Sequence, residues 1–530
     1  MSFNSDSNDK FGIYLLKKGK RGLIRALFSR IGLIIVLLAL QIGLLVAIYY
    51  WFEQKFQYFY IFTLIFSLAM VLWLLNSDAD PTAKITWLVF ITLFPVFGSV
   101  FYLYTKTDFG HRLLKRRLEK MMASSKSKFP QNESVREKLA AIDPGAGALA
   151  RYIDYSGCYP IYECEGAEYF PSGESMWLKM LEMLKSAKKF IFLEYFIIDE
   201  GEMWAAILEL LAEKAKEGVD VRVLYDGTCE FTTLPSNYPE RLEGLGIKCR
   251  MFAPLTPFLS TYFNYRDHRK IFVIDGQVAF TGGVNLADEY INRVEKFGFW
   301  KDAGLMIRGS AVKSFTLMFL QMWYNDRMDL HQEYRSFLDA SQPVSSGSRG
   351  FVIPYGDNPI DNDKLAEKVY IDILNRTRSY IHIMSPYLIL DGEMELAIKF
   401  AAERGADVKL ILPGTPDKFV PYALAKTHYS SLLKSGVRIY EYTPGFIHSK
   451  VFVSDDREAV VGSINLDYRS LYHHFECAAY MFGTECISDI ERDFSETLKD
   501  CREVTFETIK NEKLSIRLTG YIMKAVAPLI

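Results

Sequence analysis

The sequence of 530 residues has almost no net charge and few of the residues that build disulfides or metal sites. Lysine and arginine number 62 against 64 aspartates and glutamates, which gives a formal charge of -2. A protein that follows a nucleic acid needs an extended basic groove, so this balance argues against a nuclease. There are only eight histidines, and the seven cysteines are odd in number and lack metal-ligand spacing. Free thiols in a reducing compartment are therefore expected, with disulfides or zinc as the alternatives.

One short pattern is present twice. The first copy reads His268-Arg269-Lys270, IFVI, Asp275, six residues and Gly282-Gly283-Val284-Asn285, and the second reads His448-Ser449-Lys450, VFVS, Asp455, six residues and Gly462-Ser463-Ile464-Asn465. Each fits H-x-K-x4-D-x6-G-[GS]-x-N without a gap. For average residue usage, the probability of one copy at a given position is on the order of 1 in 10 million. Such a repeat indicates two copies of one structural unit.

The paired motifs suit chemistry at phosphorus. Alternate residues of a strand share a face, so His268 and Lys270 are expected to point the same way, as are His448 and Lys450. The ammonium group can hold an oxyanion while the imidazole attacks phosphorus or transfers a proton. Exchange through a covalent intermediate needs both a nucleophile and a general acid, so the two copies are expected to meet across a pseudo-twofold axis. The candidate catalytic residues are His268, Lys270, Asp275, His448, Lys450 and Asp455.

Other polar residues near the motifs are candidates for supporting roles. The amides of Asn285 and Asn465 can donate hydrogen bonds to the same phosphate oxygens, and Ser463 offers a hydroxyl group that the first copy lacks. Glu289 and Glu476 are the candidates for orienting the imidazoles, and the alternative is that they are ordinary surface carboxylates.

The aspartates of the motif have two possible roles. Asp275 lies at an odd offset from the histidine and begins Asp275-Gly276, a hairpin signal, so a structural turn and a catalytic role both remain open for it and for Asp455. No metal is expected, because neither motif has a second ligand at suitable spacing. His473-His474 is favoured as a non-ligand pair, since adjacent residues of a strand diverge.

The amino-terminal region contains three uncharged apolar runs. Residues 31–52 reach about 33 Å as a helix, enough to cross the hydrocarbon layer of a membrane. The second run, 56–75, follows closely and predicts a helical hairpin. The third, 85–104, contains Pro95 and Gly98, which kink a helix or open a re-entrant turn.

Basic residues flank this region on both sides, at 17–30 and 112–117, and both flanks favour the cytoplasm. Three full crossings cannot satisfy both, so either the third run does not cross fully or one flank is exposed despite its charge. Of these, two crossings and an embedded third segment are favoured. This predicts a multi-pass protein of the cell membrane with its catalytic part on the cytoplasmic side. The basic stretch 112–128 either sets the topology or contacts anionic headgroups. A cleavable signal peptide is not expected.

The remaining sequence alternates strands and helices. Helices are expected at 174–187, 203–217, 363–377, 392–403 and 422–434, and strands at 189–198, 219–226, 247–252, 380–389, 406–414 and 437–443. The fold class is therefore α/β, with two sheets of one plan flanked by helices. The expected division is a basic segment 1–30, a transmembrane helical region 31–104, a basic and polar, helical linker 105–148, a first domain 149–340, a linker 341–350 and a second domain 351–530.

The paired motifs resemble the signature of the phospholipase D superfamily, and the surrounding chain is similar to the bacterial cardiolipin synthase family. The segments that carry the resemblance are 264–290, 299–309, 385–394 and 436–470, together with 80–104, which is similar to the family's membrane hairpin. The sequence departs from the pattern by an extra basic and apolar segment at about 10–52, by Gly283 where serine is common, and by the absence of a second proline in SPYLIL.

The resemblance implies a transesterification without a metal or nucleotide cofactor. One histidine attacks a phosphatidylglycerol, glycerol leaves, and a second phosphatidylglycerol takes the phosphatidyl group to form cardiolipin. By family analogy His268 is the nucleophile and His448 the acid and then the base, although the near symmetry of the copies leaves this open. Lys270 and Lys450 are expected to neutralise the phosphate. The partners implied are phosphatidylglycerol and membrane lipids, with no nucleic acid, and a membrane-bound phospholipase D or a phosphatidylserine synthase is the alternative.

Overall fold

The chain forms two compact units, one containing residues 19–113 and the other made chiefly of residues 114–254 and 264–521. The structure, a computed structural model, describes residues 42–43, 46, 56–77, 81–106, 116, 132–253, 265–324, 331–344, 349–361 and 363–527. The basic segment 1–30 and most of the first apolar run lie outside the described residues. So do most of the stretch 112–128 and the middle of the linker 341–350.

In the part of the smaller unit from residue 56 to residue 106 that the structure describes, the helices are α3 (Phe56–Leu75), α4 (Pro81–Leu93) and α5 (Pro95–Lys106). The third apolar run is divided between α4 and α5, which confirms the interruption expected at Pro95, a residue without an N–H group for the helical ladder. Gly98 lies against α4, where an added Cβ atom would be 2.5 Å from the carbonyl oxygen of Phe90. The ring centroids of Trp87 and Tyr102 are 5.1 Å apart, so the two helices pack closely.

The expected transmembrane helices are not confirmed in this unit. No helix among the residues that the structure describes has both the length and the apolar character needed to cross a membrane.

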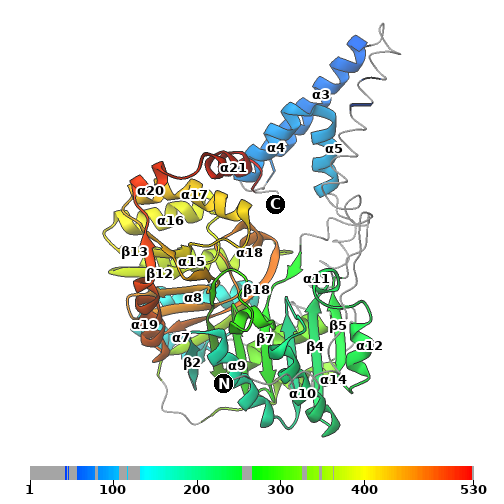
Figure 1. Ribbon diagram of the computed structural model, residues 1–530, viewed down its shortest axis with the longest axis vertical. Coiled ribbons are helices and arrows are strands. Elements are labelled where there is room, and N and C mark those ends of the chain that lie inside the picture. The colour runs from blue at the N-terminus through cyan, green and yellow to red at the C-terminus, as the bar shows by residue number, and fades with distance from the viewer. Residues whose placement is uncertain are drawn as a thin grey trace, which may run out of the picture. The chain divides into compact units, whose positions relative to one another are not determined.

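The larger unit contains two mixed β-sheets, whose strands are coloured green and yellow to orange in Figure 1. Within the described residues, the first sheet has the order β2-β10-β8-β7-β3-β4-β5 and the second the order β1-β11-β18-β17-β16-β12-β13-β14-β19. The strands of the first sheet are β2 (Ala167–Phe170), β3 (Phe190–Tyr195), β4 (Asp220–Asp226), β5 (Lys248–Phe252), β7 (Lys270–Ile274), β8 (Val278–Gly282) and β10 (Gly304–Arg308). Those of the second are β1 (Tyr162–Glu163), β11 (Phe351–Asp357), β12 (Tyr380–Met384), β13 (Asp407–Pro413), β14 (Arg438–Tyr442), β16 (Val451–Ser454), β17 (Glu458–Gly462), β18 (His474–Phe482) and β19 (Cys501–Glu503).

The two sheets repeat one topology. Strands β2, β10, β8, β7, β3, β4 and β5 correspond in order to β11, β18, β17, β16, β12, β13 and β14. The directions also agree, because β3–β4 and β12–β13 are parallel while β3–β7 and β12–β16 are antiparallel. The predicted α/β repeat is therefore confirmed. The second sheet is extended at its edges by β19 and by β1, which lies within the expected first domain 149–340 but pairs with β11 of the second.

Helices flank both sheets, mostly at the positions expected. They are α7 (Glu133–Ile142), α8 (Pro144–Gly157), α9 (Gly173–Lys185), α10 (Glu202–Lys216), α11 (Cys229–Thr232), α12 (Tyr238–Glu243), α13 (Val312–Trp323), α14 (His331–Leu338), α15 (Leu365–Arg376), α16 (Gly392–Glu403), α17 (Phe419–Lys434), α18 (Tyr468–Tyr472), α19 (Cys486–Lys499), α20 (Phe506–Lys510) and α21 (Leu514–Lys524). Ser172 and Asp391 cap α9 and α16 by accepting hydrogen bonds from backbone N–H groups of the first turn.

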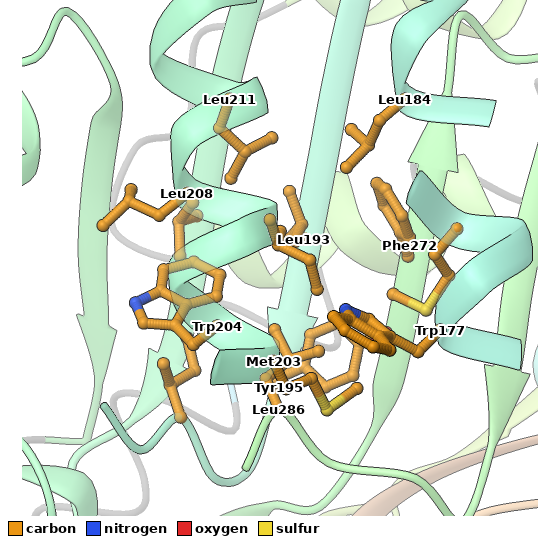
Figure 2. Close-up of a cluster of buried hydrophobic side chains, with 14 of the residues drawn as sticks. Trp177, Leu184, Leu193, Tyr195, Met203, Trp204, Leu208, Leu211, Phe272 and Leu286 are labelled. Atoms are coloured by element: carbon orange, nitrogen blue, oxygen red, sulfur yellow. The ribbon is translucent and has the colours of Figure 1, made fainter. Parts of the chain in front are cut away.

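A buried apolar cluster fixes the strand that carries the first motif. Figure 2 shows Leu184 of α9 and Trp204 and Leu211 of α10 around Leu193 of β3 and Phe272 of β7. Each such side chain, once removed from water, stabilises the fold by about 1.5–3 kcal/mol. The backbone of β7 is therefore held rigidly just beyond His268. All seven cysteines are also described, and none is disulfide-bonded, as expected.

Two short strands connect the halves. β6 (Arg266–Asp267), directly before His268, pairs in parallel with the start of β18. In the same way β15 (Gly445–Ile447), directly before His448, pairs in parallel with β9 (Phe299–Lys301) of the first half. Each motif histidine is thus held by a backbone pairing with the opposite half.

Candidate active site

The motif histidines lie at the junctions between these connecting strands and the sheets. β7 begins at Lys270 and β16 at Val451, so the expectation that each histidine lies within a regular strand is wrong in detail. In both copies the lysine nevertheless lies beside the histidine, as expected. The ammonium group of Lys270 donates a 2.6 Å hydrogen bond to the carbonyl oxygen of His268. Arg269 is instead paired with the buried Glu194 at 2.7 Å.

His268 is oriented by a carboxylate from the second half. Its Nδ1 lies 2.9 and 3.0 Å from the two carboxylate oxygens of Glu476, a buried residue of β18. An Nδ1–H group that donates to this carboxylate leaves Nε2 unprotonated and available as a nucleophile. Glu476 also accepts a short hydrogen bond from the hydroxyl group of Ser463. The structure therefore places Glu476 where the sequence suggested an orienting residue.

His448 is oriented by a carboxylate from the first half, which the sequence analysis missed. Its Nδ1 lies 2.7 Å from Oδ2 of Asp302, which is fully buried between β9 and β10. Glu289, the residue expected in this role, lies in the one-turn 3-10 helix η2 (Asp288–Ile291) and instead pairs with Lys296 at 2.9 Å. The available signal was an acidic residue directly before two small residues, which Asp302-Ala303-Gly304 and Glu476-Cys477-Ala478 share.

The two motifs meet in one buried cluster. An added Cβ atom on Gly283 of the first motif would lie 2.9 Å from the carbonyl oxygen of His448 in the second. The pKa of His268 is lowered by burial and then by the charges of Lys270 and Lys450, one from each half. The expected convergence of two imidazole–ammonium pairs is thus present in the geometry.

The two halves of this cluster differ at two positions, and the two differences compensate each other. In the second motif the Ser463 hydroxyl group supports the longer carboxylate of Glu476. In the first motif the equivalent residue is Gly283, and a Cβ atom there would overlap Oδ1 of the shorter Asp302. Asp302 instead accepts a 2.8 Å hydrogen bond from the N–H group of Ala303. The glycine noted as a departure from the family pattern therefore accommodates the second orienting carboxylate.

Burial and mutual repulsion lower the pKa values of the basic groups in this cluster. Burial, the largest cause, lowers the pKa of Lys270 to about 8 and that of Lys450 to about 7. Burial and then Lys450 lower the pKa of His448 to about 4, although Asp302 opposes the shift. For His268 the pKa is lowered well below its ordinary value. Such a cluster is stabilised by an anion, because a bound phosphate offsets the repulsion among its cations.

The asparagines of the two motifs have different surroundings. Asn285 accepts a 3.1 Å hydrogen bond from the N–H group of Ile197 and donates at 2.7 Å to the hydroxyl group of Tyr290. That tyrosine ring lies 5.4 Å from the ring of His448, so Asn285 helps to hold the wall of the site. Asn465 is buried, and its Oδ1 has no hydrogen-bond partner among the described residues. Asn465 is therefore better placed than Asn285 to hydrogen bond with a substrate.

The motif aspartates lie away from the imidazoles, at the far end of the motif strands. Asp275 is five residues beyond Lys270, about 16 Å along an extended chain. Its carboxylate accepts hydrogen bonds of 2.7, 2.6 and 2.9 Å from the N–H groups of Lys188, Lys189 and Phe190. Asp455 binds three consecutive N–H groups before β12 in the same way. The geometry favours the structural alternative for both residues.

Substitution of Asp275 by asparagine is expected to weaken the fold rather than the chemistry. Asparagine tolerates the left-handed backbone found here, with φ of 53°, but it loses the charge that supports three N–H donors. We expect the free energy of unfolding to fall by about 1–3 kcal/mol. Activity per folded molecule is expected to remain within about threefold. Denaturant titration and turnover assays on the same sample test this, and a large loss of activity in fully folded protein would contradict it.

The lowered pKa of His448 predicts a pH-dependent stability. Between pH 6.5 and about 4 the unfolded chain binds a proton that the folded protein excludes. The neutral His448 therefore makes its full contribution to the free energy of unfolding above pH 6.5. That contribution is lost as the pH falls through about 4. We expect the stability difference between wild type and His448→Asn to decrease by about 3 kcal/mol across this window. Urea denaturation at a series of pH values measures it, and a constant difference would exclude a neutral His448.

Two clusters within the described part of the chain have enough ligand atoms for a metal ion. One consists of His268, His474 and Glu476, and the other of Glu367, Asp391 and Glu393. In the first, the carboxylate already accepts hydrogen bonds from an imidazole and a serine. In the second, Glu367 pairs with Lys364 at 3.4 Å and Asp391 accepts a short hydrogen bond from Tyr472. Both clusters thus have protein partners of their own.

Comparisons with known proteins indicate the family of this chain. Residues 180–323 and 370–498 match the family described as "Cardiolipin synthase, PLD-like domain", and residues 65–105 match "Phospholipase_D-nuclease N-terminal". The cardiolipin synthase of Alkalihalophilus pseudofirmus is 34% identical over 461 residues, 86% of this chain and 90% of the relative. That of Halalkalibacterium halodurans is 32% identical over 513 residues, 95% of this chain and 100% of the relative.

A solved structure shows the same fold. The phosphatidylserine synthase of Haemophilus influenzae superposes with a TM-score of 0.53 at 16% identity, covering 72% of this chain and 97% of that one. This likeness concerns the fold alone. The family match and the two relatives, together with both complete motifs, show that this chain belongs to the phospholipase D-like cardiolipin synthase family.

Proposed function

We propose that the protein is a cardiolipin synthase that converts two molecules of phosphatidylglycerol into cardiolipin and glycerol. The observation that carries the proposal is the buried cluster of two histidines and two lysines, in which each imidazole is oriented by a carboxylate from the opposite half. The activity for which two relatives are named, each aligned over nearly its full length, supports the same reaction.

In the first step Nε2 of His268 attacks the phosphorus atom of a phosphatidylglycerol. The bond between phosphorus and the headgroup oxygen breaks, and the leaving glycerol takes a proton from Nε2 of His448, which binds that proton together with the anionic substrate. Lys270 and Lys450 balance the negative charge that develops on the phosphate oxygens. The products of this step are phosphatidyl-His268, free glycerol and neutral His448.

In the second step a hydroxyl group of another phosphatidylglycerol gives its proton to His448 and attacks the same phosphorus atom. The P–N bond breaks, cardiolipin forms, and His268 regains its lone pair. One phosphodiester is exchanged for another, so the reaction needs no input of energy and is reversible.

The electrostatics of the site support His268 as the nucleophile. Burial and the charges of Lys270 and Lys450 lower the pKa of His268 well below its ordinary value, so its imidazole keeps a lone pair for attack. His448, whose protonation Asp302 favours and a bound phosphate anion would favour further, suits the acid role.

Purified full-length protein incubated with phosphatidylglycerol alone tests the proposal. Cardiolipin and glycerol in equal amounts are expected. Phosphatidic acid as the main product would show a hydrolase, and formation of phosphatidylserine only when serine is added would show a serine-dependent transferase. Either result would replace the proposed function with another activity of the same superfamily.

We further propose that the amino-terminal helices hold the enzyme at the membrane, while the halves expected at 149–340 and 351–530 perform the chemistry. α3 has no charged residue, and many of its large apolar side chains are exposed to solvent, among them Phe62, Ile65 and Leu68. An apolar surface of this extent in a soluble protein marks an interaction site. A variant with Ile65→Lys and Leu68→Lys is expected to leave the membrane fraction on alkaline extraction, and retention equal to wild type would refute the role of α3.

A further inference from the structure

A third histidine, His474, lies inside the active site and has no role in the reaction outlined above. It is the first residue of β18, two positions before Glu476, and only 8% of its surface is exposed. Its ring centroid is 5.4 Å from that of His268, and Phe196 contacts both rings. Its imidazole thus adjoins the proposed nucleophile.

The hydrogen-bonding capacity of His474 is unused by the protein. Neither ring nitrogen has a hydrogen-bond partner among the described residues. The nearest carboxylate atom, Oε1 of Glu476, is 3.7 Å from Nδ1 and already binds His268. Leaving a buried donor without a partner is unfavourable, so a polar group at this position indicates a ligand that binds it.

At the corresponding position the opposite half has a tryptophan, whose indole Nε1–H group is also buried without a hydrogen-bond partner among the described residues. The strand pairings His474–Arg266 and Trp300–Phe446 show that position 474 corresponds to position 300, because each residue sits beside the strand that leads into the opposite histidine. Trp300 lies 5.3 Å from the ring of His448. A tryptophan flanks the acid, whereas an imidazole flanks the nucleophile.

The chemistry of attack at phosphorus indicates which substrate atoms are near His474. The leaving group departs on the side opposite to the nucleophile, toward His448. The atoms beside His268 are therefore the equatorial oxygens of the phosphate, which remain on the phosphatidyl group throughout the reaction. A neutral imidazole can donate one hydrogen bond to such an oxygen. Burial, the largest cause, lowers the pKa of His474 to about 3, so the ring is neutral at physiological pH.

We propose that His474 is an additional phosphate-binding residue, which donates a hydrogen bond to an equatorial oxygen of the phosphatidyl group beside His268. This inference rests on the proposed phosphodiester chemistry and adds a donor that the repeated motif does not contain. It also makes the site asymmetric, since the corresponding residue beside His448 is a tryptophan and not a histidine.

Inorganic phosphate, used as a competitive inhibitor of cardiolipin formation by the full-length enzyme, tests the proposal. His474→Phe keeps an aromatic ring but has no donor, and we expect its inhibition constant for phosphate to rise about tenfold. His474→Asn restores an N–H donor and is expected to return within about threefold of wild type. His473→Phe is the matched control at the adjacent position and should bind phosphate normally.

The pH dependence separates a neutral donor from a charged one. The ratio of phosphate inhibition constants for His474→Phe and wild type is expected to stay constant from pH 6 to 8. The corresponding ratio for Lys450→Met should decrease over this range, because that lysine loses its proton near pH 7 in the empty site. Thermal unfolding of each variant checks that the fold is intact.

The proposal is overturned if folded His474→Phe binds phosphate like wild type, or if folded His474→Asn is as defective as His474→Phe. Neither result affects the proposed function, which depends on the products that wild type forms from phosphatidylglycerol. If wild type forms no cardiolipin, the proposed function fails, and phosphate binding measured by calorimetry still tests the role of His474.

Discussion

Replacement of His268 or His448 by alanine is expected to lower the rate of cardiolipin formation by at least about 10^4-fold, close to the background of the assay. Each imidazole has a separate task and its own orienting carboxylate, so neither can replace the other. The rate is measured with purified variants and labelled phosphatidylglycerol. Circular dichroism and recovery in the membrane fraction serve as controls for folding. Substantial turnover by either variant would exclude a site shared by the two halves.

The same two variants distinguish nucleophile from acid. With a phosphodiester whose leaving group needs no proton, such as a nitrophenyl ester, His448→Ala is expected to form the covalent phosphatidyl-enzyme, whereas His268→Ala is not. Acid quenching followed by mass analysis of the protein detects the adduct. If the adduct forms on His448 in the His268 variant instead, the roles of the two histidines are reversed.

Replacement of the orienting carboxylates is expected to have the second largest effect. Asp302→Asn and Glu476→Gln preserve size but can donate a hydrogen bond to Nδ1, which favours the tautomer with its proton on Nε2. That tautomer has no lone pair on Nε2 for attack or for accepting a proton. We expect kcat to fall by about 10^2- to 10^4-fold with little change in KM, as is typical when a histidine is held in the wrong tautomer.

Glu289→Gln is the matched control for these carboxylates. The sequence suggested Glu289 as an orienting residue, but it pairs with Lys296 and not with an imidazole. Its substitution is expected to change kcat by less than about threefold. A loss comparable to that of Asp302→Asn would show that Glu289 contacts the reacting groups in the working enzyme.

Much of the fold could be predicted from the sequence because its signals are local. The expected helix at 392–403 coincides with α16, and the expected strand at 219–226 differs from β4 by one residue. Both carry apolar residues at the period of their element and end at turn residues. The repeat was equally evident, because His268 and His448 begin motifs of identical spacing.

The sequence determined the chemistry of this protein, since two intact pairs of histidine and lysine specify a reaction at phosphate wherever they meet. Only the tertiary structure decided which carboxylate serves each imidazole. The pairs His268–Glu476 and His448–Asp302 join residues from opposite halves, through β6 and β15, which cross between them. Periodicity and spacing describe neighbours along one strand or helix, whereas these contacts follow from how the two halves pack. For the same reason the sequence could not show that His474 lies against the nucleophile. Nor could it show that Glu289 binds a lysine and not an imidazole.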